Sequence, residues 1–106
     1  MALAVATVIR RLPVPVVARA TGAHPRTVER WRAGVTPRRR EYRGRLDDLA
    51  SILALLGPGL SRDAQRQWFT ASSAYLGGRR PIDELAAGRV ELARGAAVAY
   101  AGGDPT

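Results

Sequence analysis

The stretch Val14-Pro-Val-Val-Ala-Arg-Ala-Thr-Gly-Ala-His-Pro-Arg-Thr-Val-Glu-Arg-Trp-Arg-Ala-Gly34 decides the expected fold. It predicts a short helix over 16–20 that closes at Gly22, because glycine readily adopts the left-handed conformation of a helix end. A second helix follows over 25–32, with Pro25 in the first position, where its missing N–H costs nothing. A short helix, a tight glycine turn and a second helix form a helix-turn-helix, whose second helix enters the major groove of DNA.

The second helix of this motif has one apolar face and one basic face. Val28 and Trp31 lie three residues apart and are expected to anchor it to a core. The opposite face is expected to reach bases or nearby phosphates through His24, Arg26, Thr27 and Arg30. An arginine that binds guanine with two hydrogen bonds contributes about 1–3 kcal/mol of base discrimination.

Charge is concentrated in the same part of the chain. Eleven of the seventeen basic residues lie in residues 1–45, against two acids, which leaves +9; residues 46–106 have six arginines and seven acids, which leaves −1. A one-sided basic surface is typical of nucleic-acid binding. The run Arg38, Arg39 and Arg40 suits backbone phosphates, and a solvated loop is the alternative for it. For the whole segment, the alternative is a plain helical hairpin with a solvated basic face.

The flanking sequence predicts further helices and no strand. Helices are expected over 3–12, along the apolar stripe from Leu46 to Leu56, and from the Ser61 cap to about 72, with Ala64, Trp68 and Phe69 inward. Others are expected from Pro81 to an interruption at Gly88 and over 90–100, followed by a flexible tail over 101–106. Gly57-Pro58-Gly59 is the expected boundary. We therefore predict an all-α protein, with a helix-turn-helix bundle over 1–57 and a small helical domain over 58–106.

The sequence lacks features that several classes of protein require. The chain has no cysteine and one histidine, which excludes disulfides, thiolate catalysis and zinc sites built from histidine and cysteine. Asp47-Asp48 and Asp83-Glu84 are pairs of adjacent acids. Neighbouring side chains on a helix point in different directions, so neither pair is expected to act as a two-carboxylate catalytic site. No apolar run approaches the ~20 residues of a membrane span, and the apolar start precedes its charges, the reverse of a secretory signal. We expect a cytoplasmic protein that is no enzyme and uses neither cofactor nor metal.

The chain resembles the Xre/MbcA/ParS family of antitoxins. In the first half, Val17–Gly22 and Arg26–Gly34 resemble the family's helix-turn-helix. The Trp31-x-x-Gly34 pattern is similar to the end of its recognition helix. The second half is similar through Trp68-Phe69, Leu76–Leu85 and Gly88, which follow the tryptophan, Gly-Arg-x-Pro-x-x-x-Leu and glycine of the family's toxin-binding domain.

The resemblance implies a partner and a role. Proteins of that family neutralise RES-domain toxins, which consume NAD, while the helix-turn-helix represses the shared operon. By this likeness, the residues expected to contact a toxin are Trp68, Leu76, Gly78, Arg79, Arg80, Pro81 and Tyr100. Five of them have an ordinary structural alternative. Trp68 suits a core, Gly78 a positive-φ turn, Arg79 and Arg80 a solvated surface, and Pro81 a helix start.

Three hypotheses follow from these features. The first is an antitoxin that also represses its operon, which we expect to be a homodimer reading inverted half-sites of operator DNA. The second is a DNA-binding regulator without a toxin, whose C-terminal half serves for dimerisation. The third is a protein-interaction module with a vestigial helix-turn-helix. We adopt the first.

Overall fold

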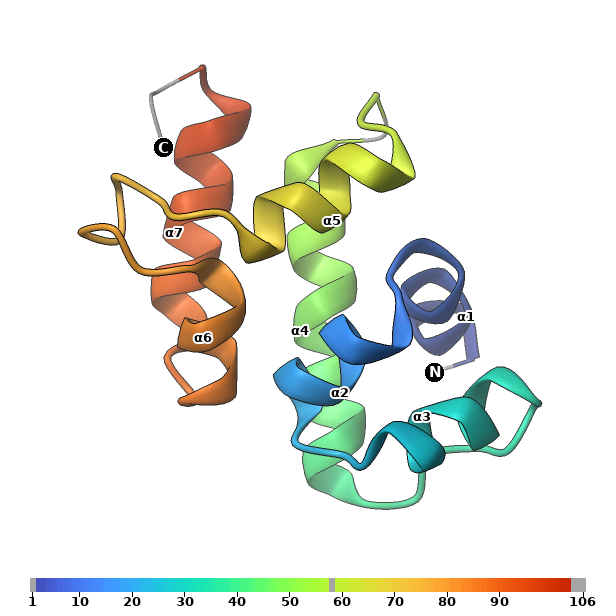
Figure 1. Ribbon diagram of the computed structural model, residues 1–106. Coiled ribbons are helices and arrows are strands. Elements are labelled where there is room, and N and C mark those ends of the chain that lie inside the picture. The colour runs from blue at the N-terminus through green and yellow to red at the C-terminus, as the bar shows by residue number, and fades with distance from the viewer. Residues whose placement is uncertain (1, 58, 104–106) are drawn as a thin grey trace.

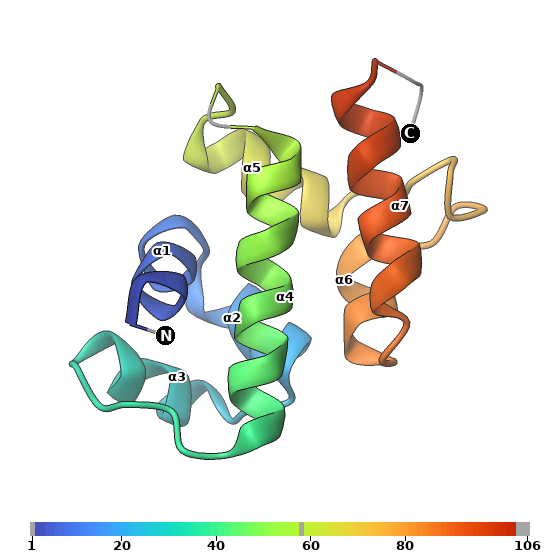
Figure 2. The same ribbon diagram turned by 180° about the vertical axis from the view of Figure 1, so that it is seen from behind.

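Helix α4 (Arg40–Leu56) is the axis around which the other helices are arranged in this computed structural model (Figure 1). Its buried face carries the expected apolar stripe, with Leu46 and Leu49 fully buried. α7 (Val90–Ala101) runs beside α4 in the same direction, as the front and rear views both show (Figure 2). The structure describes residues 2–57 and 59–103, and within them it contains seven α-helices and no strand. The expected all-α class is therefore confirmed.

The N-terminal helices cover the other side of α4. Two of them, α1 (Ala2–Arg11) and α2 (Val14–Thr21), contact α4, and α3 (Pro25–Arg32) packs against α2. Gly22 closes α2 at φ 79°, the left-handed conformation expected of it. The order α2, turn, α3 thus gives the expected helix-turn-helix.

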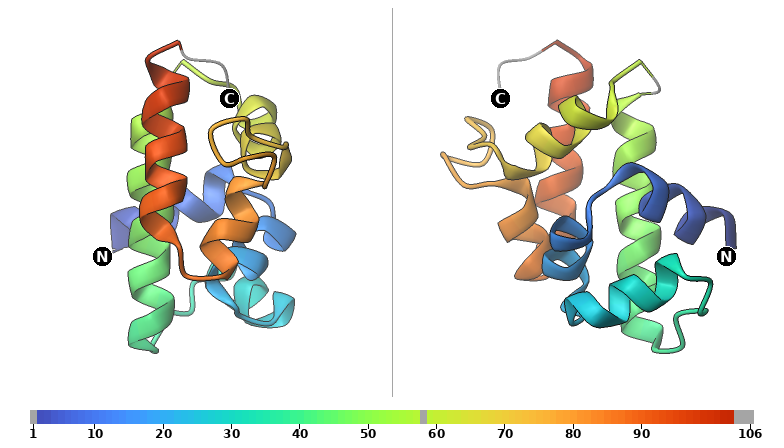
Figure 3. Two further views of the ribbon diagram at one scale, coloured as in Figure 1. Left: turned by 90° about the vertical axis from the view of Figure 1, so that its left-hand side faces the viewer. Right: turned by 45° about the vertical axis from the view of Figure 1, so that its right-hand side comes forward.

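The C-terminal part of the chain contacts this unit directly. α5 (Arg62–Thr70) crosses above it in Figure 1, and α6 (Pro81–Ala86) packs on both α2 and α7. Figure 3 shows α7 alongside α4 from the side, with the N-terminal helices beyond them. One hydrophobic cluster includes Val8, Trp31, Leu46, Phe69 and Ala96, so residues from both expected domains share a core.

Two helices begin earlier in the chain than expected. α4 begins at Arg40, six residues before its apolar stripe. The rings of Tyr42 and Trp31 meet edge to face, with 5.3 Å between their centroids, which fixes this first turn. α2 begins at Val14 because Pro15 is accommodated in the first helical turn.

One inward position of α5 also differs from expectation. Gln65 is buried, while Ala64, which was expected to face inward, is only partly buried.

Two expectations fall partly outside the described residues. Of the proposed boundary, Pro58 is not described; α4 ends at Leu56, and Ser61 caps α5 by accepting a hydrogen bond from the Ala64 N–H at 3.1 Å. Of the expected flexible tail, Asp104–Thr106 are not described, and Ala101 is the last residue of α7. No helix within the described ranges is long and apolar enough to cross a membrane.

Candidate nucleic-acid and protein interfaces

The exposed face of α3 is set by a cap and two anchors. The His24 Nδ1 accepts a hydrogen bond from the Arg26 N–H at 3.0 Å, which satisfies a free donor at the helix start. Val28 is fully buried and Trp31 is 5% exposed, as expected. Arg26 and Arg30 are consequently exposed and Thr27 is partly exposed. His24, expected to touch DNA, has a structural role as the cap, and its side chain is also exposed.

Helix α3 and the loop that follows it form one basic hollow. Thr27 and Arg30 line it from α3, while Arg38 and Arg39 line it from the loop, in a volume of about 310 Å³. The Arg39 guanidinium lies over the Tyr42 ring, 5.4 Å from its centroid. Four of the expected DNA-contacting residues are thereby brought together. The other three, His24, Arg26 and Arg40, are exposed but do not line this hollow.

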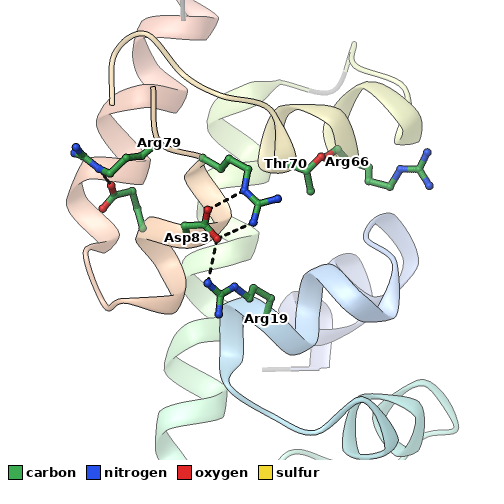
Figure 4. A network of polar contacts seen from close by, with 7 residues as sticks. Arg19, Arg66, Thr70, Arg79 and Asp83 are labelled. Carbon is green, nitrogen blue, oxygen red and sulfur yellow. Dashed lines mark hydrogen bonds and ion pairs between the residues drawn. The ribbon is translucent and has the colours of Figure 1, made fainter. Parts of the chain in front are cut away.

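An ion-pair network joins the helix-turn-helix to α6 (Figure 4). The Arg19 Nη2 donates to the Asp83 Oδ1 at 3.2 Å, and Arg80 donates to both carboxylate oxygens at 2.8 and 3.0 Å. Hydrogen bonding to Arg80, and then to Arg19, holds the pKa of Asp83 below its usual value. Arg80, expected to bind toxin, is therefore oriented by Asp83 while its side chain stays 45% exposed.

Glu84 is the residue that sequence reasoning missed most clearly. It is 0% exposed, and each carboxylate oxygen accepts a hydrogen bond from one arginine, Arg79 on one side and Arg89 on the other. These bonds, that of Arg79 first, lower the pKa of Glu84. The only sequence signal is an arginine five residues before and five residues after the acid, which is weak. Arg79 is thus held in place, with about half of its side chain exposed.

A second hollow lies where α5, the following turn and α7 meet. Trp68, Ser73 and Tyr100 line it, in a volume of about 230 Å³. Trp68 is 7% exposed and Tyr100 is 38% exposed, so the hollow has an aromatic floor and an accessible rim. The Ser73 Oγ is buried and has no hydrogen-bond partner among the described residues. A partner side chain that enters here meets an aromatic surface.

The turn between α5 and α6 is held by its backbone. The Ser73 N–H donates to the Arg79 oxygen at 2.9 Å, and the Gly78 N–H donates to the Ser73 oxygen at 2.8 Å. Gly78 has φ 93°, which glycine tolerates best. Leu76 is 2% exposed and Pro81 is buried, so these two expected toxin contacts have their side chains in the protein interior.

Exposed apolar side chains gather on α7 and the turn, where sequence reasoning did not single them out. Tyr75 is 52% exposed and Val98 is 56% exposed. The Tyr75 ring packs against Gly95, where an added Cβ would come within 3.0 Å of two ring carbons. The described residues contain no cluster of three or more His, Cys, Asp or Glu side chains able to hold a metal ion.

No known family profile matches the sequence. A probable mycobacterial cidal antitoxin of Mycobacterium tuberculosis is 37% identical over 79 residues, which is 74% of this chain and 66% of that protein. This chain therefore spans just under two thirds of that antitoxin's length. A chain in the crystal structure of the M. tuberculosis MbcT–MbcA toxin–antitoxin complex is 31% identical with a TM-score of 0.77, over 96% of this chain and 94% of that one.

Proposed function

Because this chain belongs to the MbcA type of antitoxins, we propose that it neutralises a RES-domain toxin that consumes NAD and represses its own operon through α2 and α3. The observation that carries the proposal is the likeness to a chain of a toxin–antitoxin complex along 96% of this chain, at 31% identity. A likeness of that extent includes the C-terminal surface as well as the helix-turn-helix. A partner for that surface is therefore part of the proposal.

We place the toxin at the hollow formed by Trp68, Ser73 and Tyr100 and at the adjoining turn over 71–80. Tryptophan and tyrosine dominate binding energy at protein interfaces, where partly buried aromatic side chains pack into a partner. Arg79 and Arg80 are fixed by Glu84 and Asp83 yet remain about half exposed. Preoriented guanidinium groups pair with acids on a partner at a smaller entropy cost than free ones.

We place operator DNA on the exposed face of α3 and the loop after it. Thr27 and Arg30 are positioned to read bases, and Arg38, Arg39 and Arg40 to contact phosphates. Repressors with this motif commonly bind inverted half-sites through two-fold symmetry. The active species is accordingly a homodimer on DNA, with toxin bound at the opposite end of each protomer.

Co-expression with the neighbouring open reading frame tests the antitoxin part. We expect the neighbour alone to arrest growth and deplete cellular NAD, and this chain to restore both while co-purifying with it. The Tyr100→Ala chain, altered at an exposed position and with the shared core intact, is the matched variant and should rescue and co-purify less well. A harmless neighbour that does not co-purify would contradict the proposal and favour a DNA-binding regulator without a toxin.

A reporter driven by the chain's own upstream region tests the repressor part separately. Expression of the chain should lower reporter output, and Thr27→Ala with Arg30→Ala should restore it, because these side chains face outward and their loss leaves the core intact. Toxin neutralisation by this double variant should be unchanged. Repression that survives the double variant would show that α3 does not read the operator.

A further inference from the structure

Ion pairing separates the arginines of the C-terminal half into two groups. Six arginines follow residue 45. Four of them contact a carboxylate within 4 Å: Arg79, Arg80, Arg89 and Arg94. The other two, Arg62 and Arg66 of α5, have no such contact among the described residues. This half is therefore near neutral overall, yet two of its arginines, both on α5, have no carboxylate partner among the described residues.

These two arginines face the basic N-terminal half rather than the ion-pair network. Together with Arg10 of α1 and Arg32 of α3 they line a hollow of about 190 Å³. In Figure 4 the Arg66 side chain points away from Asp83 and its partners. Asp63 is the one acid lining this hollow, and Arg32 has only the exposed Glu29 of its own helix at 3.9 Å. Four arginines from three helices and one acid thus line the same hollow.

The four-arginine cluster is continuous with the face that we assign to DNA. Arg10, Arg32 and Arg62 also line a larger hollow, of about 790 Å³, which extends to Val35 and Thr36. Val35 and Thr36 in turn line the hollow that contains Arg30 and Arg38. The two groups of arginines therefore border one continuous hollowed surface around the loop between α3 and α4, and that loop contributes no acid.

We propose that Arg10, Arg32, Arg62 and Arg66 form a second phosphate-binding tract, which contacts the DNA backbone beside the segment that α3 reads. Like charges held close together repel one another, and phosphates remove that repulsion while filling the donor groups of the arginine forks. Continuity with the α3 face favours DNA over an acidic protein as the partner. This inference rests on the proposed DNA binding and extends the interface onto α5, beyond the helix-turn-helix.

The salt dependence of DNA binding measures this tract directly. Affinity of Arg62→Ser/Arg66→Ser is compared with that of the unaltered chain over a series of salt concentrations. Two probes are used: a duplex of the chain's own upstream region and a duplex of scrambled sequence. Arg62→Lys/Arg66→Lys keeps both charges. Leu92→Glu/Val98→Glu lowers the net charge by the same two units, but on exposed positions of α7.

The expected result is a log–log salt slope that is shallower by about 0.9 for each lost phosphate contact, or about 1.8 for the serine double variant. Both duplexes should weaken by the same factor, because phosphate contacts carry no sequence information. The lysine variant should retain the slope, and the α7 variant should change it little.

Three outcomes would overturn the inference, and they are distinguishable. If the unaltered chain binds DNA and the serine variant has the same slope, α5 makes no phosphate contacts, although DNA binding stands. If the serine variant instead loses toxin and keeps its DNA slope, the cluster serves an acidic protein surface. If the unaltered chain binds neither duplex, the proposed DNA function itself fails. Retained helical content and melting temperature exclude misfolding of the variant.

Discussion

The guanidinium of Arg19 in α2 lies 3.2 Å from the carboxylate of Asp83 in α6, and so joins the helix-turn-helix to the helix that follows the turn over 71–80. Arg80, which belongs to that turn, donates to the same carboxylate. Arg80 and Arg19 thus share one acceptor (Figure 4). The helix-turn-helix and the turn over 71–80 are therefore joined through an ion-pair network as well as through the core.

Acid is expected to destabilise the fold through this network. The pKa of Asp83 is lowered, by Arg80 first, and that of Glu84 is lowered, by Arg79 first. A carboxyl group with a lowered folded-state pKa stabilises the fold above its unfolded pKa, about 4, and that contribution is lost as pH falls through the folded value. Urea unfolding between neutral and acid pH should show this decline.

Asp83→Asn isolates one part of that dependence. At neutral pH it should lower the free energy of unfolding by about 1 kcal/mol or less, because the pairs are partly exposed. The difference from the unaltered chain should vanish at a pH below the folded pKa of Asp83. Asp47→Asn, at an exposed position outside the ion pairs of the described residues, is the control. A difference that persists unchanged into acid would contradict the assignment.

Glu84→Gln should have a larger effect at neutral pH. It keeps the shape of the side chain but removes the charge that accepts from both Arg79 and Arg89 at a fully buried site. We expect a loss of about 1–3 kcal/mol, the usual effect of leaving a buried polar group poorly satisfied. Glu91→Gln removes the same charge at a site that is 83% exposed and should change stability little. Equal stability of both variants would show that the buried pair contributes nothing.

Gly95→Ala should stabilise the fold by less than the ~1 kcal/mol that alanine gains over glycine in a helix. An added Cβ would meet the Tyr75 hydroxyl first and two ring carbons at 3.0 Å, so the Tyr75 ring, which is 52% exposed, has to move aside. Thermal melting should show a larger gain from Gly95→Ala in a Tyr75→Ala background than in the unaltered chain. Gly44→Ala, in α4 with nothing within 4 Å, should stabilise by the full amount. A gain at Gly95 equal to that at Gly44 would show that Tyr75 is not packed on α7.

Tyr100→Ala tests the proposed toxin surface. Loss of an aromatic side chain at the centre of an interface commonly costs more than 1 kcal/mol, so toxin affinity should fall at least about fivefold. Leu55→Ala is the control, because Leu55 has a similar exposure, 37% against 38%, and lies on α4. Calorimetric titration of purified toxin measures both. Equal losses in the two variants, or none in either, would place the toxin elsewhere.

The sequence predicted most of the fold because local signals were strong. Pro13, Gly22, Pro25 and Ser61 marked helix ends that the structure contains within one or two residues. Val28 and Trp31 were expected to be buried from spacing alone, and they are. In each case a backbone preference or a helical period acts within a few residues.

What escaped prediction depends on contacts between distant segments. Burial of Glu84 requires arginines on both flanks to fold over it, and the start of α4 at Arg40 depends on Trp31 packing against Tyr42. The hollow beneath Tyr100 requires α7 to meet the end of α5. Arg62 and Arg66 belonged by sequence to a near-neutral half, yet they face Arg10 and Arg32. These contacts join segments that are distant in the sequence, so no local sequence pattern predicts them.

The central claim is neutralisation of an NAD-consuming toxin, and the most direct test is the rate of NAD loss catalysed by the purified neighbouring gene product as this chain is titrated in. NAD loss should fall in proportion to added chain and stop near a fixed molar ratio, while Tyr100→Ala should require a higher concentration. An undiminished rate of NAD loss at excess chain, with both proteins folded, would contradict neutralisation by this chain.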